Sequence, residues 1–245
     1  MCHTDDSRPP APPRTGHAGA ARRLHLTGPD GARFMAYHAL TTVPDAPAAV
    51  ILPDLRGLHE FYVQFADRLA DAGVEALVVD YYGRELLDGP RTATAEEMFP
   101  LVMALPPEQV AGDIAAAAAH LRGGGSRPVF SLGFCFGGSQ SWIQSALDPD
   151  LAGCIGFYGR PAECRPYVGD MQVPLLLLVA GADAFTPAAE FERFAAELAD
   201  AGVDHEMTVY AGAPHSFFDG AAGHPEACDD AWRRVLDFVT ARAHA

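Results

Sequence analysis

The stretch PVFSLGFCFGGSQSWIQSAL, residues 128–147, contains the strongest structural signal in this sequence. It opens as a short apolar run typical of a buried strand and closes as a helix, with a sharp glycine-rich turn between them. Gly133 and Gly137 flank Cys135 at this turn, because β-carbons at these two positions would clash with the turn and the adjoining elements. The helix N-terminus that follows Cys135 favours a thiolate and an oxyanion. We therefore expect Cys135 to be a nucleophile at the end of a sheet.

Two other interpretations of this stretch stay open. Free cysteine is among the most buried residue types, so one alternative is a structural cysteine in a glycine-rich loop. The other is a nucleotide-binding glycine loop, although the third glycine of that fingerprint is missing and the turn comes late in the chain. We expect a structural role for the other four cysteines, which are Cys2, Cys154, Cys164 and Cys228.

On both sides of this turn, strand-like and helix-like segments alternate along the chain. The alternation predicts an α/β fold in a single domain, with one mostly parallel sheet and helices on both faces. We expect residues 1–20 to be a flexible, Pro- and Ala-rich leader and residues 21–245 to form the domain. The pattern predicts a hairpin over 23–40 that turns at Pro29-Asp30-Gly31, strands at 48–54, 75–83, 128–134, 152–159, 173–181 and 205–212, and helices at 60–73, 107–125, 138–147, 187–202 and 224–243.

The composition excludes several classes of function. The 245 residues include 17 basic and 32 acidic side chains, and the net charge of −15 disfavours nucleic acid and anionic membrane surfaces as partners. Every basic residue is arginine, and the absence of lysine excludes Schiff-base catalysis, the P-loop and Ser-Lys dyads. The five irregularly spaced cysteines predict neither disulfides nor a zinc site. We expect a cytoplasmic protein without a metal, a cofactor, a secretion signal or a membrane segment.

A nucleophile of this kind needs a base, and the base needs an acid that orients it. The predicted strand at 173–181 ends just before Asp183, and the strand at 205–212 ends just before His215. The order nucleophile, acid, histidine is the one that this type of strand-to-helix elbow uses. Taken alone, Asp183 also fits a helix cap and His215 also fits an ordinary loop histidine. Together the three residues favour a Cys135–His215–Asp183 triad.

These segments resemble the dienelactone hydrolase family of α/β-hydrolases over roughly residues 45–240. GFCFGG (133–138) resembles the cysteine elbow of the family, GADAFTP (181–187) its acid loop, and APHSFFD (213–219) its histidine loop. The resemblance implies the α/β-hydrolase fold and a triad that opens esters or lactones through a thioester.

The resemblance also implies roles for residues around the triad. The backbone N–H groups of Leu55 and Phe136 would form the oxyanion hole, and the Asp54 carboxylate would lie near the thiol, with a helix cap near His59 as its alternative role. Arg84 matches an arginine that grips the substrate carboxylate in the prototype lactonase, but Asp219 stands where the prototype has a second arginine. One arginine facing an aspartate is a poor carboxylate clamp, so we expect neutral esters or lactones to be preferred.

The remaining candidate substrate contacts are Phe134, Ser216 and Phe217, and core packing is the alternative role of the two phenylalanines. We expect a hydrolase of small esters or lactones, monomeric or a small homo-oligomer, whose partner is a small-molecule substrate. Two alternatives stay open. One is an acyltransferase or cyclase with the same triad, and the other is a non-catalytic binding protein on the same fold.

Overall fold

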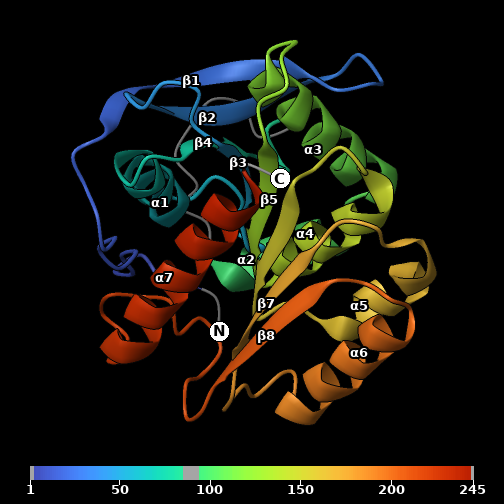
Figure 1. Cartoon of the computed structure of the whole chain (residues 1–245). Helices are drawn as coiled ribbons and strands as arrows, with labels where there is room; N and C mark the ends of the chain where they lie inside the picture. The colour runs from blue at the N-terminus through green and yellow to red at the C-terminus, as the bar shows by residue number, and fades with distance from the viewer. Residues whose placement is uncertain (1–2, 85–93, 244–245) are drawn as a thin grey trace.

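The computed structural model describes residues 3–84 and 94–243, which form an eight-stranded sheet with helices on both sides (Figure 1). β2 is antiparallel to both of its neighbours, and all other neighbouring strands are parallel, which confirms the predicted α/β fold. In spatial order the strands are β1 (Ala18–Thr27), β2 (Arg33–Thr41), β4 (Glu75–Val79), β3 (Ala48–Leu52), β5 (Val129–Phe134), β6 (Gly153–Phe157), β7 (Leu175–Ala180) and β8 (His205–Tyr210).

The helices form two layers around this sheet (Figure 1). The first and last helices cover one face, and three helices that lie between them in the sequence cover the other. The helices are α1 (Glu60–Asp71), α2 (Ala95–Met103), α3 (Pro107–Arg122), α4 (Phe136–Leu147), α5 (Pro161–Cys164), α6 (Ala188–Asp200) and α7 (Pro225–Arg242), with a 3-10 helix η1 (Arg165–Asp170) after α5. α1 and α7 lie on the first face, and α3, α4 and α6 on the second.

Each face of the sheet carries its own hydrophobic core. Successive side chains of a strand point to opposite faces, so Ile51 of β3 packs toward α1 and α7 while Val50 and Leu52 pack toward α3 and α4. All residues of β3 are buried, as expected of a parallel strand covered on both faces.

Two α-helices of the described residues are missing from the sequence prediction, as is the 3-10 helix η1. α2 contains Pro100, which argues against a helix interior, yet its first turn is closed by a capping box between Thr94 and Glu97. α5 has only four residues, which is too short for a helical period to be visible in the sequence.

The described part of the N-terminal segment packs against the rest of the protein. His3, Ser7, Pro9 and Pro10 are buried, and β1 already begins at Ala18. The composition of this segment predicts flexibility, but its contacts come from residues far away in the chain, which composition does not reveal.

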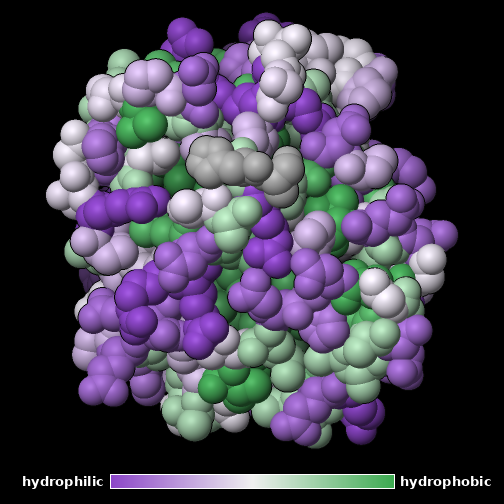
Figure 2. Space-filling view, in the orientation of Figure 1, coloured by the Kyte–Doolittle hydropathy of each residue, from purple (hydrophilic) through white to green (hydrophobic). Residues whose placement is uncertain are grey.

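The carboxyl ends of the parallel strands lie at one edge of the sheet, and the loops that leave this edge carry the predicted site residues. Figure 2 shows a hydrophilic surface over α7, while apolar residues reach the surface at the lower end of the same view. None of the helices in the described ranges has the length and apolar character needed to cross a bilayer.

Candidate active site

Cys135 occupies the sharp turn between β5 and α4. Its backbone adopts φ 55° and ψ −114°, a conformation that is rare for residues with a side chain and that is concentrated at functional sites. A β-carbon on Gly133 would collide with the backbone of Gly137, and one on Gly137 would collide with the carbonyl of Leu52. The Cys135 amide donates to the Phe157 carbonyl at 3.0 Å. The elbow predicted from the sequence is present, with a half-buried cysteine at its apex.

His215 and Asp183 follow β8 and β7 and contact each other directly. The Nδ1 atom of His215 lies 2.7 Å from the Oδ2 atom of Asp183, whose side chain is fully buried. The amides of Phe185 and Thr186 donate to Oδ1 of Asp183 at 2.8 and 3.3 Å. Burial opposes ionisation of Asp183, but the hydrogen bond from His215 and the two amides lower the pKa of this carboxyl below its usual value. Asp183 is therefore an ionised acceptor that orients the histidine ring.

His215 also forms a hydrogen bond with Cys135, so its ring lies between the acid and the thiol. Burial lowers the pKa of His215, but the hydrogen bonds and charges of Asp183 and Cys135 outweigh burial and raise this pKa to about 9. The imidazole therefore carries a proton at neutral pH. The structure brings together the three residues that the sequence predicts as a triad.

Cys135 opens into a cavity of about 350 Å³, which lies within the size range of small-molecule sites. Leu55 and Phe136, the two residues expected at the oxyanion hole, both line it. Because Phe136 is the first residue of α4, its amide has no acceptor within the helix. The lining residues are Leu55, Phe99, Val102, Met103, Pro107, Ala111, Cys135, Phe136, Gln140, Ile143, Leu147, Arg160, Glu163 and Tyr167.

Asp54 lies in the same region as the thiol. Its Oδ1 atom accepts the Arg56 amide at 2.9 Å, and its buried Oδ2 atom has no hydrogen-bond partner among the described residues. Burial raises the pKa of Tyr81 well above its usual value, and the charges of Asp54 and Cys135 add to this effect, which places both groups near the Tyr81 phenol. The cap of α1 is His59 rather than Asp54.

The two charged residues expected at the substrate carboxylate do not line this cavity. Arg84 pairs with Asp30 and Asp113 and borders a different surface hollow. Asp219 is buried and accepts the amide of Arg8 at 3.1 Å, so it faces the N-terminal segment. The expectation that Asp219 opposes Arg84 across the substrate is wrong, because each side chain is bound by partners distant in sequence.

The other expected substrate contacts lie behind or beside the triad. Phe134 and Phe217 are fully buried in the core shared with α1 and α7, where Phe134 stacks on Phe157 with ring centroids 4.6 Å apart. Ser216 follows His215 with φ 61°. None of these three candidates is among the described residues that line the cavity of Cys135. Phe134 and Phe217 therefore pack in the core, which is the alternative role expected for them.

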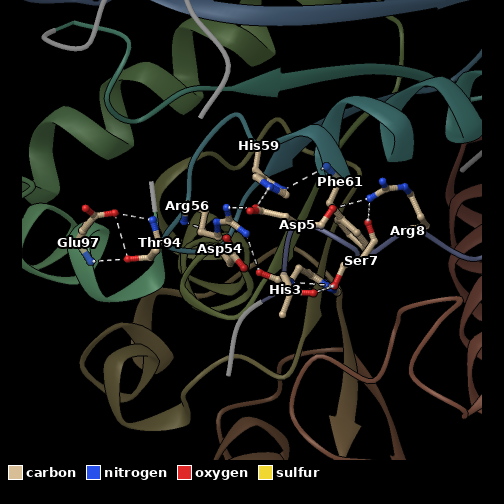
Figure 3. Close-up of polar contacts among 11 residues, drawn as sticks. His3, Asp5, Ser7, Arg8, Asp54, Arg56, His59, Phe61, Thr94 and Glu97 are labelled. Carbon is tan, nitrogen blue, oxygen red and sulfur yellow. Dashed lines mark hydrogen bonds and ion pairs between the residues drawn. The ribbon is translucent and has the colours of Figure 1, made fainter. Parts of the chain in front are cut away.

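The N-terminal segment packs against the loop that follows β3 (Figure 3). Arg56 donates to the main-chain carbonyl of His3 at 3.0 Å and to the Asp5 carboxylate at 2.6 Å, and His59 lies 3.3 Å from the same carboxylate. The Nε2 atom of the buried His3 is 3.2 Å from the phenol oxygen of Tyr158. The segment therefore contributes to the surroundings of the site.

Two aromatic residues that pack on His215 are missing from the sequence prediction. The ring centroids of Tyr158 and Phe185 lie 4.9 and 5.1 Å from that of His215. Tyr158 has φ 37°, a second unusual backbone conformation next to the triad. Their positions in the sequence could have identified both residues. Tyr158 directly follows β6 at the carboxyl edge of the sheet, and Phe185 comes two residues after Asp183.

Among the described residues, which do not include Cys2, the other titratable groups add no metal site and no second candidate thiol. In residues 3–84 and 94–243, no group of three or more His, Cys, Asp or Glu side chains is arranged to hold a metal ion. Burial raises the pKa of Cys228 to about 11 and that of Cys154 to about 12, and it also raises the pKa of Cys164. These three thiols stay protonated at neutral pH, in keeping with the structural role expected of them.

The sequence and the fold are similar to those of known proteins. The sequence model of the dienelactone hydrolase family matches residues 34–242. A Yersinia pestis protein with the provisional name carboxymethylenebutenolidase is 29% identical over 207 residues, which cover 79% of this chain and 78% of that protein. A Bradyrhizobium protein, provisionally named a 2-oxo-3-(5-oxofuran-2-ylidene)propanoate lactonase, is 26% identical over 228 residues and covers 86% of this chain and 91% of its own. A crystal structure of a provisionally named dienelactone hydrolase from Klebsiella pneumoniae has a TM-score of 0.77 at 27% identity, with 91% of this chain and 99% of that chain covered.

Proposed function

The chain belongs to the dienelactone hydrolase family and is a hydrolase of lactones or esters, and we propose that it cleaves a small ester or lactone through a thioester on Cys135. The observation that carries the proposal is the position of His215, which bonds to Asp183 at 2.7 Å and to Cys135 on its other side. In this proposal Cys135 is the nucleophile, His215 the acid and base, and Asp183 the orienting group.

The raised pKa of His215 supports a charged resting state. A pKa of about 9 keeps the imidazole protonated at neutral pH, and in our proposal the paired Cys135 is a thiolate. The N-terminus of α4 stabilises an anion at this position. The nucleophile is thus formed before the substrate binds, and His215 already carries the proton that the leaving group needs.

Acylation begins when the Cys135 sulfur forms a bond with the carbonyl carbon and the carbonyl electron pair moves to oxygen. The amides of Leu55 and Phe136 donate to this oxyanion. When the carbonyl re-forms, the carbon–oxygen bond to the leaving group breaks, and His215 gives its proton to the departing alkoxide. The products of this step are a thioester and a neutral imidazole.

Deacylation uses the same groups in reverse. The thioester carries no thiolate charge, so the contribution of Cys135 to the raised pKa of His215 disappears and the ring becomes a base. The neutral ring removes a proton from a water molecule whose oxygen attacks the thioester carbon. The sulfur leaves as a thiolate, the carboxylic acid departs, and the charged Cys135–His215 pair is restored.

The test is to trap the thioester with an activated ester and to locate it by intact-mass and peptide-mass spectrometry. Wild type should gain one acyl group on Cys135, whereas Cys135→Ala should gain none and lose about 10³-fold or more in kcat/KM. Cys228→Ala, which removes a buried thiol instead, is the matched control and should label as wild type does. Acylation at another residue, or substantial turnover by Cys135→Ala, would disprove the assignment. Analysis of the products separates hydrolysis from the alternatives of acyl transfer and cyclisation.

A further inference from the structure

The cavity that begins at Cys135 continues along one face of α4. Phe136, Gln140, Ile143 and Leu147 all line it, and their spacing of three or four residues places them on a common side of the helix. A helix rises about 1.5 Å per residue, so this face extends about 17 Å from the elbow to Leu147.

A second group of lining residues comes from α2 and is apolar. Phe99, Val102 and Met103 line the same cavity at the spacing of one helical face. Phe99 is 54% exposed, Met103 is 66% exposed and Leu147 is 47% exposed. Three of the six large apolar side chains that are exposed in the described residues therefore surround this one cavity. Apolar surface gathered in this way is typical of a binding groove.

The charges along the groove cancel. Arg160 and Glu163 are the charged residues among its described lining, and they pair with each other at 2.8 Å. A negatively charged group on the substrate would therefore meet a cation that is already paired. The groove favours a neutral chain over one that ends in a carboxylate.

The position of His215 decides which half of an ester lies in the groove. His215 must reach the leaving alkoxide to protonate it, but it is not among the described residues that line the groove. The leaving group therefore lies on the His215 side of the sulfur. The acyl group lies on the other side, along α4.

We infer that the preferred substrate is an ester with a linear, uncharged acyl chain of about eight to twelve carbons, an inference that rests on the proposed function. An extended alkyl chain advances about 1.25 Å per carbon, so a groove of about 17 Å accommodates a chain of this length once the thioester group is placed. Because the far end is open at Leu147, longer chains extend into water and gain no further contact.

The first experiment measures kcat/KM for 4-nitrophenyl esters from acetyl to tetradecanoyl, each below its micelle concentration. A methylene buried in a half-open groove increases kcat/KM about two- to fourfold, so decanoyl, with six more methylenes, should exceed butanoyl by about 60-fold or more. The rise should end near dodecanoyl. Ethyl decanoate should be a better substrate than decyl acetate, because the groove receives the acyl side.

The second experiment adds a charge to the apolar walls of the groove. Leu147→Asp, at the far end of α4, and Met103→Asp, on the wall from α2, should each lower the ratio of decanoyl to butanoyl kcat/KM by about tenfold, since a charge on these walls disfavours an apolar chain more when the chain is longer. Leu101→Asp is the matched control, because Leu101 is exposed on the same helix as Met103 but does not line the groove. It should leave this ratio unchanged, which separates a local effect from general damage to α2.

The possible results distinguish this inference from the proposed function. Two results would overturn the inference and leave the proposed function intact. One is an active enzyme that prefers acetyl or butanoyl esters, or that prefers decyl acetate to ethyl decanoate. The other is a wild-type ratio of decanoyl to butanoyl kcat/KM in Leu147→Asp and Met103→Asp. Absence of turnover for every ester, together with no acyl group on Cys135, would overturn the proposed function and this inference with it.

Discussion

The Nδ1 atom of His215 lies 2.7 Å from the Oδ2 atom of Asp183, although 32 residues separate the two in sequence. They meet because β7 and β8 are parallel neighbours, paired from Leu175 with His205 to Ala180 with Tyr210, so the loops that follow these strands leave the sheet side by side. Two backbone amides hold the Asp183 carboxylate in place. The carboxylate therefore fixes the orientation of the ring and leaves the other ring nitrogen for Cys135.

Asp183→Asn should lower kcat/KM by about 10²- to 10⁴-fold, because the amide keeps the size of the carboxyl group but not its charge. The same change removes a cause of the raised pKa of His215, so the alkaline limit of activity, expected near pH 9, should move to lower pH. A pH profile of kcat/KM is the measurement, with the exposed Asp200→Asn as the control. An unchanged alkaline limit would contradict the role given to Asp183.

His215 should make the stability of the fold depend on pH. Its folded pKa of about 9 lies above the ordinary value of 6.5, so the native state binds the proton more tightly than the unfolded chain does. This stabilisation is fully present below pH 6.5 and is lost as the pH rises through 9. We therefore expect wild type to lose about 2–3 kcal/mol of unfolding free energy relative to His215→Gln as the pH rises over this interval. Denaturant titrations at pH 6 and pH 9.5 test this, and equal differences at both would refute it.

Gly137→Ala should destabilise the protein by about 3 kcal/mol or prevent folding, because the added β-carbon collides with the carbonyls of Leu52 and Pro53. Gly169→Ala is the control, since a β-carbon there has no heavy atom within 4 Å and should change stability by less than about 0.5 kcal/mol. Thermal or chemical denaturation compares the two. A stable, active Gly137→Ala enzyme would show that the elbow tolerates a wider turn.

Asp219→Asn should act on stability and not on substrate charge. Burial opposes ionisation of Asp219, but hydrogen bonds from His3, Ser7 and backbone amides lower its pKa well below the usual value, so its stabilisation is present above pH 4 and is lost as the pH falls. We expect Asp219→Asn to lower the free energy of unfolding by about 1–3 kcal/mol at pH 7.

The exposed Asp6→Asn, from the same N-terminal segment, is the control for this change and should have little effect. The preference between a carboxylate-bearing lactone and its methyl ester should be equal in wild type and Asp219→Asn. A preference that changes in Asp219→Asn would show that Asp219 does influence the charge of the substrate that is bound.

Much of the site follows from local sequence. The elbow at Cys135 depends on the small size of Gly133 and Gly137, and the glycine spacing around the cysteine can be recognised in the sequence itself. The positions of Asp183 and His215 follow from two apolar strands that end just before them, because parallel strands deliver their carboxyl ends to one edge. Apolar periodicity likewise determined the main strands and helices.

Only the tertiary structure decided the partners of the charged residues and the course of the substrate groove. Arg84 meets Asp113, and Asp219 meets Arg8, through contacts that no local spacing encodes. The groove exists because α2, with an internal proline, contributes apolar side chains to the same cavity as one face of α4. Apolar periodicity and the glycine spacing of the elbow lie within single segments and can be deduced from the sequence. Ion pairs, cavity walls and the contact between Gly137 and the Leu52 carbonyl depend on which distant segments the folded chain brings together.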